Sequence, residues 1–234
     1  MVKNTTINLE VIYKTAVALG ELKVQVVYVG GATVSLYIND PAADEVRPTK
    51  DVDITLAISS LGELEAIREL LIRKGFKQSP EDDIICRFRY EDIKVDVMST
   101  KPVGWAPANQ WFAPGFAQKE IVRIKDQKIQ ILPLHYFLAS KFSAFNDRGA
   151  KDPRTSQDLE DIVYVLDNRT DIVEEMIKAP DDVRPYLADQ LQKILDDRVM
   201  QEAILGNLFY KTREDRFQRI IRSIEQIVKS FRLI

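Results

Sequence analysis

The sequence has almost none of the residues that build disulfides, zinc sites or thiol and imidazole catalytic centres. It contains one cysteine, Cys86, and one histidine, His135. A single cysteine forms no intramolecular disulfide, and a structural zinc site needs about four Cys or His ligands. Zinc centres and Cys-His or Ser-His-Asp catalysis therefore lack the residues they require. We expect Cys86 to lie in a buried strand and His135 to be structural, in the first turn of a helix.

The chain also lacks a long apolar run, a strong excess of charge and a glycine- or proline-rich composition. No stretch approaches the ~20 apolar residues of a membrane helix, and the first residues contain no apolar targeting segment. With 33 basic and 36 acidic side chains the net charge is -3, which argues against attraction of the whole surface to nucleic acid or anionic membranes. Hydrophobic residues make up 45%, with only 9 Gly and 10 Pro, which excludes collagen-like and disordered classes. We expect a globular, cytoplasmic protein that does not associate with membranes.

The hydrophobic pattern predicts an α/β fold in which a mixed sheet is followed by a helical part. We expect one domain over residues 1–132 and a helical domain over residues 133–234. The predicted strands are residues 24–29, 51–57, two strands within 84–98 that meet at 91–92, 120–125 and 128–132. The predicted helices are residues 7–20, 32–38, 60–74, 133–147, 156–167, 170–178, 183–204 and 207–231, with 101–115 as an irregular loop.

Three aspartates are the strongest candidates for chemistry. Asp51 and Asp53 are two residues apart on one predicted strand, so their carboxylates point to the same face about 6.5–7 Å apart at the backbone. Asp96 lies on the polar face of a later strand. Carboxylates that converge from neighbouring strands are the usual ligands of Mg²⁺ or Mn²⁺, although a solvated sheet face gives the same Asp-x-Asp pattern. An Asp96 buried in an ion pair away from Asp51 and Asp53 would argue against an enzyme.

A glycine pair, Gly30-Gly31, follows the predicted strand 24–29 and precedes a short helix. This arrangement presents backbone N–H groups and the positive end of a helix to a phosphate. The pair is neither a Walker loop nor a Rossmann fingerprint, and alone it is a weak signal. Its combination with the Asp-x-Asp strand and the distal aspartate is more specific.

This combination resembles the nucleotidyltransferase superfamily of polymerase beta type. In the second half, residues 136–142, Arg148-Gly149, Lys151-Asp152 and residues 156–162 look like the helices of the AbiEii toxins, nucleotidyltransferases of type IV abortive-infection systems. The resemblance covers roughly residues 24–167. The 19 residues between Gly31 and Asp51 exceed the compact spacing of minimal members, which implies a longer loop that can reshape nucleotide selection.

The resemblance implies transfer of a nucleoside monophosphate from an NTP to a hydroxyl of RNA, such as a tRNA 3′ end, or of a protein. Asp51, Asp53 and Asp96 are the implied catalytic residues and the ligands of Mg²⁺ or Mn²⁺. The implied nucleotide-binding residues are Gly30, Gly31, Thr49, Lys50, Lys141 and Asp158. An antitoxin is an implied partner. The alternative is a catalytically silent nucleotide-binding or protein-interaction module, possibly one half of a toxin–antitoxin pair.

Other residues carry weaker expectations. We expect Arg148 and Asp152 to form an ion pair at a helix junction. Trp105, Trp111 and Phe112 are expected to anchor their loop to the core, with base stacking as the alternative. Residues 206–234 carry seven basic and three acidic side chains. We expect a solvated helix face there, with RNA phosphates as the alternative ligand.

Overall fold

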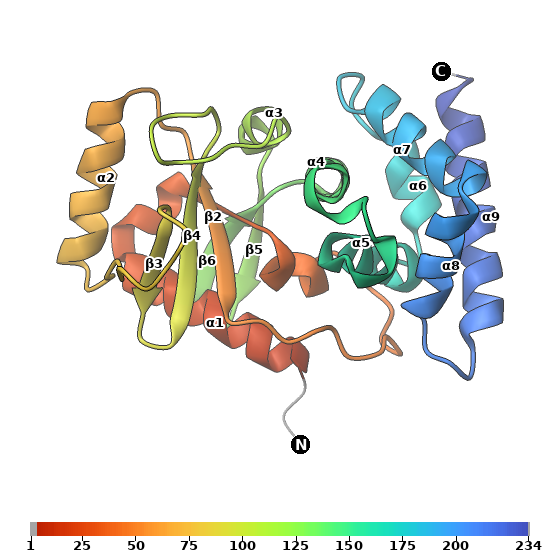
Figure 1. Ribbon diagram of the computed structural model, residues 1–234, viewed down its shortest axis with the longest axis horizontal. Coiled ribbons are helices and arrows are strands. Elements are labelled where there is room, and N and C mark those ends of the chain that lie inside the picture. The colour runs from red at the N-terminus through yellow and green to blue at the C-terminus, as the bar shows by residue number, and fades with distance from the viewer. Residues whose placement is uncertain (1–3, 234) are drawn as a thin grey trace. The chain divides into compact units, whose positions relative to one another are not determined.

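A computed structural model describes residues 4–233 and confirms the predicted α/β fold (Figure 1). The chain divides into two compact units. Unit 1 comprises the chain through Ser35 together with Glu45–Phe137, and unit 2 comprises Leu36–Asp44 together with the chain from Leu138 onward. The division into functional domains of residues 1–132 and 133–234 stays a prediction, because these units are defined by contacts alone.

Unit 1 is built on a six-stranded mixed sheet of order β3-β4-β2-β1-β6-β5. Its strands are β1 (Val26–Val29), β2 (Asp51–Leu56), β3 (Arg87–Tyr90), β4 (Ile93–Ser99), β5 (Glu120–Ile124) and β6 (Gln127–Ile131). β2 runs parallel to β4 and β1 runs parallel to β6, whereas the β1–β2, β3–β4 and β5–β6 pairs are antiparallel. The predicted turn at residues 91–92 separates β3 from β4, and Glu91 there adopts a φ of 54°.

Side-chain alternation along β2 gives the sheet its buried face. Val52 and Ile54 are buried as predicted, and α1 (Asn4–Leu19) contacts β2, β4 and β6. Thr55 is also fully buried, so the predicted polar face is open near Asp51 and closed towards the end of the strand. α2 (Leu61–Arg73) begins at Ser60, whose hydroxyl accepts the Glu63 N–H at 3.2 Å.

Two segments of unit 1 differ from the sequence-based prediction. The segment 101–115, expected to be irregular, includes the start of α3 (Phe112–Ala117). Cys86 is buried as predicted but lies in a turn just before β3, where its neighbour Ile85 is 67% exposed. The apolar run before β3 is therefore not a buried strand, because only one of its side chains reaches the core.

Unit 2 is helical. Its elements are α4 (Leu134–Ala144, which begins in unit 1), the π-helix η3 (Phe145–Gly149), the 3₁₀ turn η4 (Pro153–Thr155), α5 (Gln157–Asn168), α6 (Ile172–Ile177), α7 (Arg184–Asp196), α8 (Arg198–Gly206) and α9 (Arg213–Phe231). The single helix predicted over residues 183–204 was wrong. The chain breaks at Asp197, whose carboxylate accepts the Val199 N–H at 2.7 Å and so caps the start of α8.

The first part of the long predicted loop belongs to unit 2. The Asn39 side chain donates to Asp171 at 2.8 Å, and the Arg169 guanidinium donates to the Tyr37 carbonyl at 3.1 Å. The Tyr164 hydroxyl donates to the Asp44 carbonyl at 2.9 Å. The segment Leu36–Asp44 is therefore fastened to α5 and the chain after it. Within residues 4–233, no helix is both long enough and apolar enough to cross a membrane.

Candidate functional site

The turn after β1 brings Gly30 against Asp53. Gly30 has a φ of +79°, and its carbonyl accepts the Thr33 hydroxyl at 2.9 Å and the Thr33 N–H at 3.3 Å. A Cβ at position 30 would lie 1.8 Å from Asp53 Oδ2. Position 30 therefore needs glycine for two reasons, the left-handed backbone and the space that Asp53 fills. The predicted helix after it is the 3₁₀ helix η2 (Gly31–Leu36), so a phosphate here would depend on individual N–H groups rather than on the dipole of a long helix.

Strand pairing gathers the three predicted aspartates on one face of the sheet. Asp53 and Asp96 are direct partners across the parallel β2–β4 pair, and Asp51 is two residues before Asp53 on β2. Side-by-side residues on neighbouring strands point to the same face about 4.8 Å apart. Asp51 is exposed, Asp53 is half-buried and Asp96 is 8% exposed. The acids therefore form a line from solvent into the protein.

Arg87 forms a bidentate ion pair with the carboxylate of Asp96. Its Nε donates to Oδ1 at 2.7 Å and its Nη2 donates to Oδ2 at 2.7 Å, and the two residues are direct partners across β3–β4. The hydrogen bond to Asp96 raises the pKa of Arg87, so the guanidinium carries its positive charge. Asp96 is thus buried in an ion pair, but beside Asp53 rather than away from it. The condition that would argue against an enzyme is not met.

The negative charge of this site affects the pKa of the nearby thiol of Cys86. Burial, followed by the charges of Asp96 and Asp53, raises the pKa of Cys86 to about 11. The thiol is therefore protonated at neutral pH, which agrees with the prediction that Cys86 is structural rather than a nucleophile.

The chain just before β2 is held by α1. The buried Asn8 donates to the Arg47 carbonyl at 3.0 Å and accepts the Thr49 N–H at 2.9 Å. The Thr49 hydroxyl in turn accepts the Asp51 N–H at 3.0 Å. Thr49 therefore helps to fix Asp51, and its predicted contact with the nucleotide stays a prediction.

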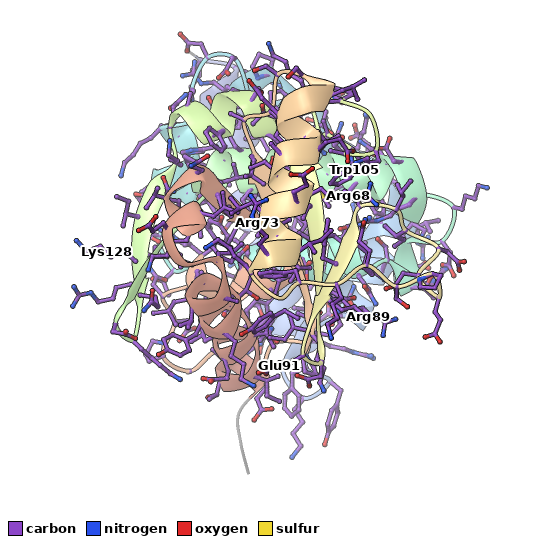
Figure 2. All side chains as sticks on the ribbon, turned by 90° about the vertical axis from the view of Figure 1, so that its left-hand side faces the viewer. Arg68, Arg73, Arg89, Glu91, Trp105 and Lys128 are labelled. Carbon is purple, nitrogen blue, oxygen red and sulfur yellow. The ribbon has the colours of Figure 1, made fainter. Side chains whose placement is uncertain are left out.

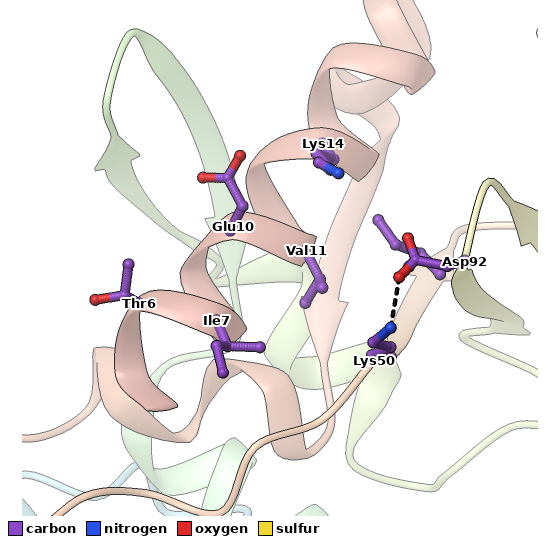
Figure 3. Close-up of a pocket in the computed structure, with 8 residues that line it drawn as sticks. Thr6, Ile7, Glu10, Val11, Lys14, Lys50 and Asp92 are labelled. Atoms are coloured by element: carbon purple, nitrogen blue, oxygen red, sulfur yellow. Dashed lines mark hydrogen bonds and ion pairs between the residues drawn. The ribbon is translucent and has the colours of Figure 1, made fainter. Parts of the chain in front are cut away.

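Lys50 is paired with Asp92 of the turn between β3 and β4, at 2.5 Å. This pair and residues of α1 line a pocket of about 360 Å³ (Figure 3). Lys50 holds the pKa of the Asp92 carboxyl below its ordinary value. To contact a nucleotide, as predicted, Lys50 would first have to leave Asp92.

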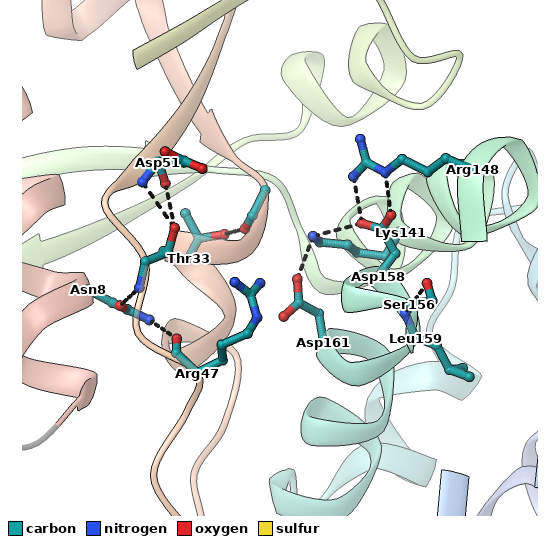
Figure 4. Close-up of polar contacts among 12 residues, drawn as sticks. Asn8, Thr33, Arg47, Asp51, Lys141, Arg148, Ser156, Asp158, Leu159 and Asp161 are labelled. Atoms are coloured by element: carbon teal, nitrogen blue, oxygen red, sulfur yellow. Dashed lines mark hydrogen bonds and ion pairs between the residues drawn. The ribbon is translucent and has the colours of Figure 1, made fainter. Parts of the chain in front are cut away.

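In unit 2, Lys141 is buried between two carboxylates, as Figure 4 shows. Its Nζ lies 2.6 Å from Asp161 Oδ2 and 3.3 Å from Asp158 Oδ1. Arg148 also forms an ion pair with Asp158, donating from Nε to Oδ2 at 2.7 Å and from Nη2 to Oδ1 at 2.9 Å. The two carboxylates and the two cationic side chains of this cluster together carry no net charge. The predicted contact of Lys141 and Asp158 with the nucleotide stays a prediction.

Burial alone would raise the pKa of Asp158, but the hydrogen bond from Arg148 and the charge of Lys141 outweigh it and lower that pKa. The predicted ion pair between Arg148 and Asp152 was wrong, because Arg148 pairs with Asp158. Asp152 instead accepts the Arg154 N–H at 3.3 Å and caps the η4 turn.

Trp105, in the loop after β4, and two arginines of α9 form polar contacts with acidic side chains. The Trp105 indole donates to Glu65 of α2 at 2.8 Å. On α9, Arg216 and Arg219 both pair with the buried Asp167, at 2.8 and 2.7 Å. Trp105 therefore fastens its loop to α2, and two arginines of α9 pair with a carboxylate within unit 2.

The donor set suits a divalent metal ion in its chemistry but is not gathered around one centre. Among residues 4–233, no group of three or more His, Cys, Asp or Glu side chains is arranged to hold a metal ion. The hard oxygen ligands that Mg²⁺ and Mn²⁺ prefer are present in Asp51, Asp53 and Asp96. The carboxylate of Asp96, however, is already engaged by Arg87 through both oxygens.

Sequence reasoning assigned no role to Arg87, Asn8 or Asp161. Arg87 had a detectable signal, because Arg87 and Arg89 alternate with aromatic residues on a predicted strand. Asn8 falls on the same helix face as the core residue Ile12, where a polar side chain is unexpected. Asp161 is three residues after Asp158 and so shares its helix face.

A mixed sheet with aspartates on adjacent strands beside a glycine turn indicates the class of nucleotidyltransferases. The family model described as "Nucleotidyl transferase AbiEii toxin, Type IV TA system" matches residues 16–232. The chain therefore belongs to the AbiEii family of nucleotidyltransferase toxins of type IV toxin–antitoxin systems. Membership implies an NTP substrate, a divalent metal and an antitoxin partner.

Among solved structures, the chain is similar to a crystal structure of an antigenic nucleotidyltransferase-like protein from Paracoccidioides brasiliensis. The two share 18% sequence identity over 86% of this chain and 93% of the other, with a TM-score of 0.49. A comparison with curated proteins found no significant match.

Proposed function

We propose that the protein transfers a nucleoside monophosphate from an NTP to a hydroxyl of RNA, such as a tRNA 3′ end, or of a protein side chain. The observation that carries this proposal is the direct pairing of Asp53 with Asp96 across β2 and β4, beside Gly30. Family membership supports the reaction type, and the acceptor is the finer part of the proposal.

Asp51, Asp53 and Asp96 are the residues that would hold Mg²⁺ or Mn²⁺. Such an ion would neutralise charge on the triphosphate and lower the pKa of the attacking hydroxyl. The protein itself contributes a fixed backbone around these acids. Asn8 and Thr49 hold the start of β2, and the absence of a side chain at Gly30 leaves room for Asp53. This turn, with Gly31, would receive the phosphates through its backbone N–H groups.

The test is incorporation of each of four α-labelled NTPs into total RNA and total protein, with and without Mg²⁺, by wild type and Asp53→Asn. The variant removes one charge while keeping the side-chain shape. Label that appears in one fraction with one NTP, and is lost with Asp53→Asn, supports the proposal and identifies base and acceptor class.

The alternative is a catalytically silent nucleotide-binding module, which the Arg87–Asp96 pair favours because an arginine holds the third acid without a metal ion. NTP binding by calorimetry with no label in either fraction would support this alternative. The assay therefore separates the two functions by their products and not only by loss of signal.

A further inference from the structure

Arg87 binds both oxygens of the Asp96 carboxylate. Both oxygens accept a 2.7 Å hydrogen bond from Arg87. The side chains are 14% and 11% exposed, so water does little to compete with the pair. Without a partner, a buried carboxylate is strongly destabilising. Arg87 therefore holds the carboxylate of Asp96 in one orientation in the metal-free protein.

The same pair opposes a metal ion. A divalent cation would compete with the guanidinium for the two carboxylate oxygens, each of which already accepts a hydrogen bond, and it is repelled by the guanidinium charge. Asp51 also attracts Arg87, and this attraction contributes to the raised pKa of the arginine. The arginine thus lies within the field of the acids that would share the metal.

We propose that Arg87 is a positioning residue that occupies Asp96 in the metal-free protein and releases it when a divalent cation binds at Asp51, Asp53 and Asp96. This inference rests on the proposed function. In this scheme, metal binding is an exchange of one cation for another at Asp96, so the acid is never left buried without a positive partner. Removing Arg87 should therefore strengthen metal binding, the opposite of what structural damage would do.

The chain offers a matched control on the same strand. Arg89 is two residues further along β3 and makes the same two-bond contact with Asp82, at 2.7 and 2.8 Å. Figure 2 shows Arg89 on this part of unit 1. Arg87→Gln and Arg89→Gln change the net charge equally. Any difference between them in metal binding therefore belongs to the contact with Asp96 rather than to long-range charge.

The experiment measures Mn²⁺ binding to the full chain by titration calorimetry without nucleotide, together with thermal unfolding with and without Mn²⁺. We expect Arg87→Gln to bind Mn²⁺ about tenfold more tightly than wild type. It should unfold at a lower temperature without metal and recover when Mn²⁺ is added, because a ligand that binds only the folded state stabilises it. Arg89→Gln should bind Mn²⁺ within about twofold of wild type.

The outcomes separate this inference from the proposed function through Asp53→Asn. If wild type binds Mn²⁺ in a way that Asp53→Asn abolishes, but Arg87→Gln binds equally or more weakly, the exchange at Asp96 is overturned and the metal site stands. If neither wild type nor Arg87→Gln binds Mn²⁺, both ideas fail. Should Arg87→Gln not fold, Arg87→Lys keeps the charge with a poorer fit to the carboxylate. It should bind about threefold more tightly than wild type, and unchanged or weaker binding overturns the inference.

Discussion

The carboxylate of Asp53 fills the space that any side chain at position 30 would need. An added Cβ on Gly30 would lie 1.8 Å from Asp53 Oδ2 and 2.6 Å from its Cγ. Val29, the residue before this glycine, is the direct partner of Asp53 in the antiparallel β1–β2 pair, so the register of the sheet places Gly30 next to Asp53. The glycine turn and the Asp-x-Asp strand therefore act as one structural feature.

Gly30→Ala should disturb both the backbone and Asp53. The φ of +79° disfavours alanine, and the overlap forces Asp53 to move, so we expect a loss of about 1–3 kcal/mol in the free energy of unfolding. Mn²⁺ binding should weaken at least about tenfold, which corresponds to a loss of about 1.4 kcal/mol in binding free energy. Urea unfolding and titration calorimetry measure the two effects.

The control for this substitution is Gly206→Ala at the end of α8, where an added Cβ meets no atom within 4 Å. Stability and Mn²⁺ binding should stay within error or improve slightly, because alanine is the better helix former. Wild-type Mn²⁺ affinity in Gly30→Ala would show that the turn and Asp53 are independent.

Lys141→Met should be strongly destabilising at pH 7. The substitution leaves Asp158 and Asp161, which are 3% and 2% exposed, without the cation between them. Breaking a buried ion pair in this way costs about 3–5 kcal/mol. Lys193→Met is the matched control, because its pair with Asp189 is 56% and 59% exposed and should contribute under about 1 kcal/mol. Equal urea midpoints for the two variants would contradict the prediction.

The contribution of Arg148 should depend on pH. Because the folded protein lowers the pKa of Asp158, the stabilisation is complete above the ordinary value of 3.8 and is lost as the pH falls through the lowered value. Arg148→Gln removes a main cause of the lowering. We expect it to cost about 1–2 kcal/mol at pH 7, discounted for the exposure of the arginine, and progressively less below about pH 4. Urea unfolding of both proteins from pH 3 to pH 7 tests this, and a difference that does not change with pH would rule it out.

Cys86 should be almost unreactive in the folded protein. Its pKa of about 11, set first by burial and then by the charges of Asp96 and Asp53, leaves few thiolates at pH 8. A disulfide reagent at pH 8 should label it slowly in buffer and rapidly in urea. Since the chain has a single cysteine, the absorbance change reports this one thiol. Rapid labelling of the folded protein would show that the turn before β3 opens readily.

Much of the architecture could be predicted because its signals are local. Alternation in residues 51–57 placed Val52 and Ile54 inside and Asp51 outside, and the turn at residues 91–92 separated two strands. The break at Asp197 was missed because apolar periodicity continues across it, while the capping contact to Val199 is visible only in the folded backbone.

By itself, the sequence determined the Asp-x-Asp pair, the glycine turn and the distal aspartate, since each depends on residue type and short spacing. Only the tertiary structure decided that Asp96 lies beside Asp53, that Arg87 holds Asp96, and that the segment Leu36–Asp44 is fastened to helices more than a hundred residues away. Strand order and register join residues far apart in the chain. They are set by the packing of the whole sheet, which no local pattern records.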